Sequence, residues 1–71
     1  MFMTRSQQSR VRLEALEAWR AAAHLVSARW ERFLYTEPQM RIFAYASYVA
    51  ALDSEEAAAA YLQAVARPAA A

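Results

Sequence analysis

The chain contains no glycine in its 71 residues, and this absence limits the folds that it can adopt. Tight turns between strands usually hold a residue at positive φ, a conformation that glycine adopts at little cost. Proline occurs only as Pro38 and Pro68, and the sequence is rich in Ala, Leu, Glu, Arg and Gln. These residues favour helices. The sequence therefore predicts an all-α fold.

The first half of the chain has the apolar spacing of one long amphipathic helix. Apolar residues recur at alternating intervals of three and four positions, as one face of a helix requires. They are Leu16, Trp19, Ala23, Val26, Trp30 and Phe33. Thr4 and Gln7 have the spacing of a capping box, which satisfies the first free amides of a helix, and Ser6 and Ser9 are competing caps. We expect a helix over residues 6–35.

The segment Thr36-Glu37-Pro38 is predicted to end this helix, because proline disfavours helical geometry at the residue before it. Thr36 and Gln39 again have capping-box spacing, so a second helix is expected over 38–52. Asp53, followed by acids in a first turn, is typical of a further helix start and predicts a third helix over 54–66. The alternative is one continuous or kinked helix, and it is supported by a stripe through Met40, Ala44, Ser47, Ala51, Ser54, Ala58, Tyr61 and Val65.

The link at residues 36–37 is so short that the second half must fold back antiparallel on the first. The expected unit is a helical hairpin or three-helix unit in a single domain, residues 1–67. A disordered tail is expected at 68–71. The small residues Ala44, Ser47, Ala51 and Ala58 would allow close helix approach.

The apolar content predicts association. The apolar fraction is 59%, against roughly 45–50% in an average domain. A chain this short buries a limited core, and without cysteine it has no disulfide to stabilise it. We therefore expect a homo-oligomeric helical bundle, a homodimer above all, or a protein partner. The predicted interface residues are Leu16, Trp19, Val26, Trp30 and Phe33.

Several functional classes lack the residues that they need. Without glycine there can be no Gly-rich phosphate loop. Cysteine and lysine are absent, and the single histidine, His24, is predicted on the polar face of the first helix. The residue three before it is Ala21, so the Glu-x-x-His metal pair is missing. We expect no catalytic residues, no metal ligands and no cofactor.

A nucleic-acid-binding regulator is the alternative to an interaction module. Arg5, Arg10 and Arg12 precede the first acid, Glu14, and arginine contacts phosphate well. The net charge is only +1, and one long helix does not suit a helix-turn-helix. Nucleic acid is therefore not the favoured partner.

The chain has no run of roughly 20 apolar residues and no apolar signal core, so a cytoplasmic protein without a membrane partner is expected. The favoured function is a small adaptor, regulator or assembly subunit that binds protein.

Overall fold

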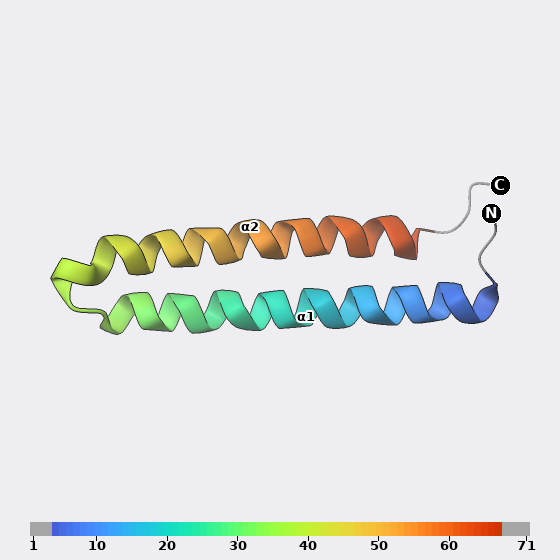
Figure 1. Ribbon diagram of the computed structural model, residues 1–71, viewed down its shortest axis with the longest axis horizontal. Helices are drawn as coiled ribbons and strands as arrows, with labels where there is room; N and C mark the ends of the chain where they lie inside the picture. The colour runs from blue at the N-terminus through green and yellow to red at the C-terminus, as the bar shows by residue number, and fades with distance from the viewer. Residues whose placement is uncertain (1–3, 68–71) are drawn as a thin grey trace.

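The computed structural model describes residues 4–67, which form two long helices packed side by side in an antiparallel hairpin (Figure 1). Helix α1 spans Arg5–Tyr35, the short 3-10 helix η1 spans Pro38–Met40, and α2 spans Arg41–Ala66. No strand occurs within residues 4–67, so the all-α prediction is confirmed. The molecule is long and narrow, 53 × 18 × 17 Å. The tail predicted at 68–71 lies outside the described residues.

The start of α1 follows from its capping box, as the sequence predicts. The Gln7 backbone amide donates to Thr4 Oγ1 at 3.1 Å, and the Thr4 amide donates to Gln7 Oε1 at 2.8 Å. Two amides that the helix leaves without partners are satisfied in this way. Because both residues are near in sequence, no tertiary contact is needed to fix this end.

The capping box predicted at Thr36 and Gln39 does not form. Thr36 and Glu37 have extended backbones, and Pro38 opens one turn of 3-10 helix before α2 begins. The Thr36 hydroxyl instead donates to the Arg32 carbonyl, and Gln39 Nε2 donates to Glu37 Oε2 at 2.8 Å. The intervening 3-10 turn places Met40, which has no capping side chain, before α2.

Helix α2 runs without a break through Asp53, so the predicted division into helices 38–52 and 54–66 is wrong and the continuous alternative is correct. No proline or glycine interrupts this segment. Ala44, Ala51, Ala58 and Val65 recur at seven-residue intervals, and each is buried or half-buried. A break at Asp53 would rotate half of this stripe away from α1. In the continuous helix the stripe stays against α1, and Asp53 lies exposed on the outer side.

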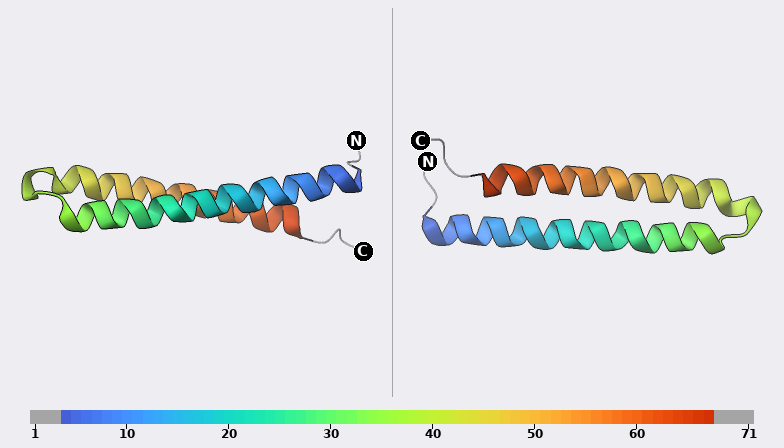
Figure 2. Two further views of the ribbon diagram at one scale, coloured as in Figure 1. Left: turned by 90° about the horizontal axis from the view of Figure 1, so that it is seen from below. Right: turned by 180° about the vertical axis from the view of Figure 1, so that it is seen from behind.

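The seam between the helices closes on alanine. Ala15 and Ala51 are 2% and 3% exposed, and Ala44 is also buried. Trp19, Val26 and Phe33 on α1 and Tyr48 and Leu62 on α2 are half-buried along the same line. No large side chain among the described residues is fully buried. The two helices form a single layer with no third element over it in the described chain, and Figure 2 shows that they cross at a shallow angle. The larger seam side chains therefore keep part of their surface exposed to solvent.

Candidate interaction surface

Four aromatic rings join the two helices near the turn. Trp30 contacts Phe33 and Tyr48, with ring centroids 5.5 and 5.0 Å apart. Tyr45 closes the group through Phe33 at 5.6 Å and Tyr48 at 6.3 Å. All four contacts are tilted, the arrangement that aromatic quadrupoles favour. This cluster fixes the register of α1 against α2 in the turn-proximal half.

Large apolar side chains extend from the aromatic cluster over one broad side of the hairpin. This surface, the Trp30 face, consists of Leu13, Leu16, Trp30 and Leu34 from α1 and Ile42, Tyr45 and Leu52 from α2. Trp30 is 42% exposed and Ile42 is 72% exposed. These residues occupy positions next to the seam in the helical repeat, on the side where Trp30 meets Tyr45 and Tyr48 through the cluster.

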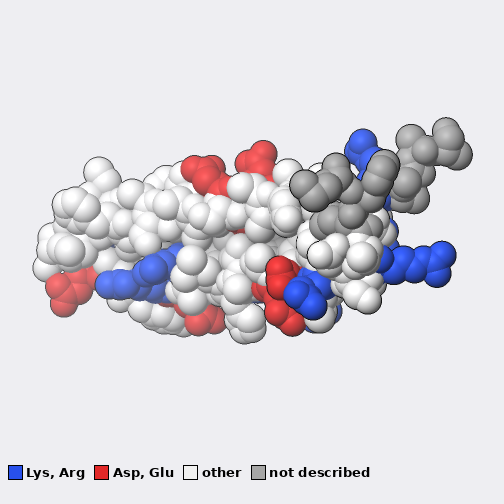
Figure 3. Space-filling view, turned by 45° about the vertical axis from the view of Figure 1, so that its right-hand side comes forward, with Lys and Arg blue, Asp and Glu red and all other residues white. Residues whose placement is uncertain are grey.

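Charges on the Trp30 face are confined to its middle. The face positions of α1 between Leu34 and Arg20 are Trp30, Ser27 and Ala23, and none of these side chains is charged. On α2 the face positions from Ile42 to Leu52 are likewise uncharged, and the first charged one is Glu56. Figure 3 shows the opposite side of the hairpin for contrast, where basic and acidic side chains also lie near the turn. The half of this face near the turn is therefore suited to contact with another apolar surface.

The structure divides the five predicted interface residues between two places. Trp19, Val26 and Phe33 point into the seam and are half-buried against α2, within one chain. Leu16 and Trp30 lie on the Trp30 face, where Trp30 remains exposed. The prediction did not include the contribution of α2 to the face. A period of three and four through Ile42, Tyr45, Val49 and Leu52 was the signal that could have found it.

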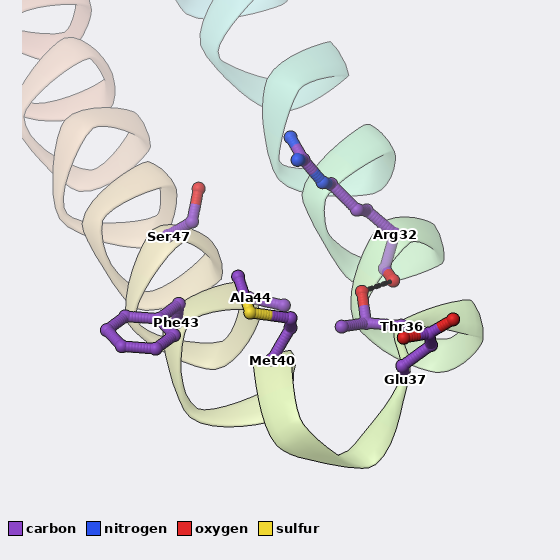
Figure 4. A pocket seen from close by; sticks show the side chains of 7 residues that line it. All are labelled: Arg32, Thr36, Glu37, Met40, Phe43, Ala44 and Ser47. Carbon is purple, nitrogen blue, oxygen red and sulfur yellow. Dashed lines mark hydrogen bonds between the residues drawn. The ribbon is translucent and has the colours of Figure 1, made fainter.

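The opposite side of the hairpin, the Ser47 face, carries Leu25, Met40, Phe43, Ser47 and Tyr61. Near the turn it holds a cleft of about 400 Å³, lined by residues of α1, η1 and α2 (Figure 4). Met40 and Phe43 form its apolar wall, and Arg32 extends along the space between the helices. Glu37 and Arg32 place opposite charges at this cleft, and none of its polar side chains is buried.

The arginines proposed for nucleic acid lie at the open end of the hairpin, opposite the turn. Arg5 and Arg10 are exposed on the first turns of α1. Arg12 is engaged within the chain, because its Nε donates to the Val65 carbonyl at 3.2 Å. That bond satisfies a carbonyl in the last turn of α2 and brings a cation to the negative end of the helix dipole. The antiparallel fold adds Arg67, which the sequence reasoning had not grouped with them.

The remaining titratable side chains are dispersed. His24 is exposed, as predicted. Within residues 4–67, no three His, Asp or Glu side chains gather in a way that could hold a metal ion. Over the same described residues, neither helix has an apolar stretch sufficient to cross a membrane.

The sequence matches no protein-family model, and comparisons with curated proteins and with solved structures found no significant match.

Proposed function

We propose that this protein is a small helical interaction module that associates with a second copy of itself and acts as an adaptor, regulator or assembly subunit. The observation that carries the proposal is the exposure of large apolar side chains. Trp30, Leu34, Ile42 and Tyr45 are each more than two-fifths exposed on the Trp30 face. Contiguous apolar surface of this kind is uncommon on isolated soluble domains and is typical of protein interaction sites.

The accessible surface of the chain supports the same proposal. It amounts to 6022 Å² for a mass of 8.0 kDa. A compact monomer of this mass exposes about 4,450 Å², so the excess is about 1,600 Å². This excess is larger than the roughly 800 Å² that each partner buries in a standard interface.

The direct test is the mass in solution, measured by light scattering on a sizing column over a range of concentrations. We expect twice the 8.0 kDa of one chain. Trp30→Ala should shift the protein toward monomer, because it removes the largest side chain of the exposed face. A monomer at every concentration, from the unaltered chain, would refute self-association.

Trp30→Ala also tests whether Trp30 stabilises the single hairpin or the dimer. A fully buried tryptophan replaced by alanine costs about 3–5 kcal/mol. Trp30 is 42% exposed in the single hairpin, so the loss within one chain should be smaller. The remaining loss should appear in the dimer and depend on protein concentration. Thermal unfolding at two concentrations separates these contributions.

A second candidate function is nucleic-acid binding at the open end. The observation in its favour is that the fold brings Arg67 to the end where Arg5 and Arg10 are exposed. The described residues at the tip of that end, 4–13 and 65–67, contain no Asp or Glu. Fluorescence anisotropy with duplex DNA at low and moderate salt tests it, since each phosphate contact makes binding salt-dependent. Binding should be lost in an Arg5/Arg10/Arg67→Ala variant. No binding at low salt would exclude this function.

A further inference from the structure

We propose that the second copy docks on the Trp30 face with both turns at the same end, so that α1 of each chain lies over α2 of the other. Every neighbouring pair of helices is then antiparallel, as in an up-and-down four-helix bundle. This inference rests on the proposed self-association and specifies its surface and orientation. Three features of the Trp30 face support it: its size, the distribution of its apolar side chains and the position of its two central charges.

The size of the face suits a dimer that overlaps along the whole hairpin. The molecule is 53 Å long and 18 Å wide, so the area of one broad side is about 950 Å². A standard interface buries roughly 800 Å² on each partner. Overlap of only the turn-proximal halves would provide about half of that area, below the usual range for a specific interface.

Large apolar side chains are concentrated in one half of the face. Trp30, Leu34, Ile42 and Tyr45 lie near the turn, whereas the half near the open end offers only Leu13 and Leu16 beside smaller and polar residues. With both turns at one end, the two apolar halves cover one another. In the reversed dimer, with the turns at opposite ends, each apolar half would cover the more polar half of its partner.

The two central charges favour the same orientation. Trp30 lies opposite Tyr48 and Phe33 lies opposite Tyr45, which fixes the register of the hairpin. Counted along that register, Arg20 lies within about 3 Å of the level of Glu56. With the turns at one end, α1 lies over the partner's α2. Arg20 then meets the partner's Glu56, and the reciprocal pair forms by symmetry.

The reversed dimer has the opposite electrostatics. Its two-fold axis would place α1 over the partner's α1, with Arg20 near the middle of the overlap. Arg20 would then approach the partner's Arg20, and Glu56 would approach the partner's Glu56. Like charges at an interface disfavour an orientation even where opposite charges add little affinity.

A hollow beside Arg20 fits the proposed packing. It measures about 380 Å³ and is lined by Trp19, Arg20, Ala23, His24 and Ser27. In the register above, Leu52 lies at the level between Ala23 and Ser27. The partner's Leu52 can therefore enter the hollow, as a knob enters a hole in a helical bundle.

Orientation is measured most directly from one label at the turn. The chain has no cysteine, so Gln39→Cys provides a single site for a nitroxide. Pulsed dipolar spectroscopy should give a distance of roughly 10–25 Å if both turns lie at one end, from the spacing of packed helices and the label length. A distance near the 53 Å length of the molecule would overturn the proposed orientation. A monomeric mass without dipolar coupling would instead refute the proposed self-association.

Charge exchange at Arg20 and Glu56 gives an independent result. Arg20→Glu should weaken the dimer by roughly tenfold at low ionic strength, because two opposite-charge pairs become like-charge pairs. The double variant Arg20→Glu/Glu56→Arg should recover the affinity. An Arg20→Glu dimer as tight as the unaltered one would overturn the proposed pairing.

A matched pair of leucine variants tests the choice of face. Leu34, on the Trp30 face, is 53% exposed and Leu25, on the Ser47 face, is 41% exposed. Leu34→Lys should abolish dimer formation, while Leu25→Lys should leave it unchanged. The reverse result would assign the interface to the Ser47 face and overturn the proposal. Helix content from circular dichroism verifies that both variants remain folded.

Discussion

Replacement of Ala51 by leucine should wedge the two helices apart. Ala51 is 3% exposed in the middle of α2, where its methyl group fills the space against α1. Leucine would place an isobutyl group in that space. Overpacking a closed site costs about 1–3 kcal/mol. For a domain of this size each kcal/mol lowers the melting temperature by about 4–8 °C, so Ala51→Leu should lose about 5–20 °C.

Ala50→Leu is the matched control, because it makes the same substitution one position earlier on an exposed site of the same helix. Both variants change helix propensity equally, and an exposed change should stay within about 0.5 kcal/mol. Thermal unfolding followed by circular dichroism at one protein concentration compares them. If Ala51→Leu melts at or above the temperature of Ala50→Leu, the helices do not close on Ala51 and the described packing is refuted.

Three further substitutions test local features. Thr4→Ala removes the capping box and should cost about 1 kcal/mol, with faster amide exchange in the first turn of α1; unchanged exchange would argue against the cap. Arg12→Met breaks the bond to the Val65 carbonyl and should speed exchange in the last turn of α2, and equal exchange rates would show that the bond contributes nothing. Asp53→Ala should leave stability unchanged or raise it by up to about 0.7 kcal/mol, since alanine suits a helix interior better. A loss of 1 kcal/mol or more in the melt would mean that Asp53 caps a helix after all.

The features that the sequence predicted correctly depend on residues close together in the chain. Thr4 and Gln7 are one helical turn apart, and Pro38 acts on its immediate neighbour, so both signals operate without knowledge of the fold. The short link before Pro38 also made the antiparallel hairpin predictable.

Asp53 shows where local signals fail. A capping aspartate and an exposed aspartate inside a helix have similar sequence neighbours, and the choice depends on whether the apolar stripe keeps its register across that position. Here Ala51 and Ala58 continue the stripe of Ala44, so packing against α1 maintains the helix.

The division of the α1 stripe between the seam and the exposed face could not be predicted from the sequence, for a different reason. The sequence reasoning centred the stripe of α1 on large residues such as Leu16 and Trp30, whereas the most buried residue of α1 is Ala15. Small residues allow the backbones to come together, so the seam is rotated toward them and Trp30 moves to its flank. Periodicity predicts an apolar stripe, and the same spacing serves residues in the seam and residues on the exposed face.

The two helices are joined by a turn at one end of the hairpin, and their other ends lie side by side at the opposite end. This arrangement determines how the hairpin responds to force. The start of α1 and the end of α2 lie at the same end of the hairpin (Figure 1), where Arg12 Nε donates to the Val65 carbonyl. Tension applied between those ends would peel the helices apart one seam residue at a time, instead of shearing the whole seam at once. The aromatic cluster, farthest from the points of attachment, would open last.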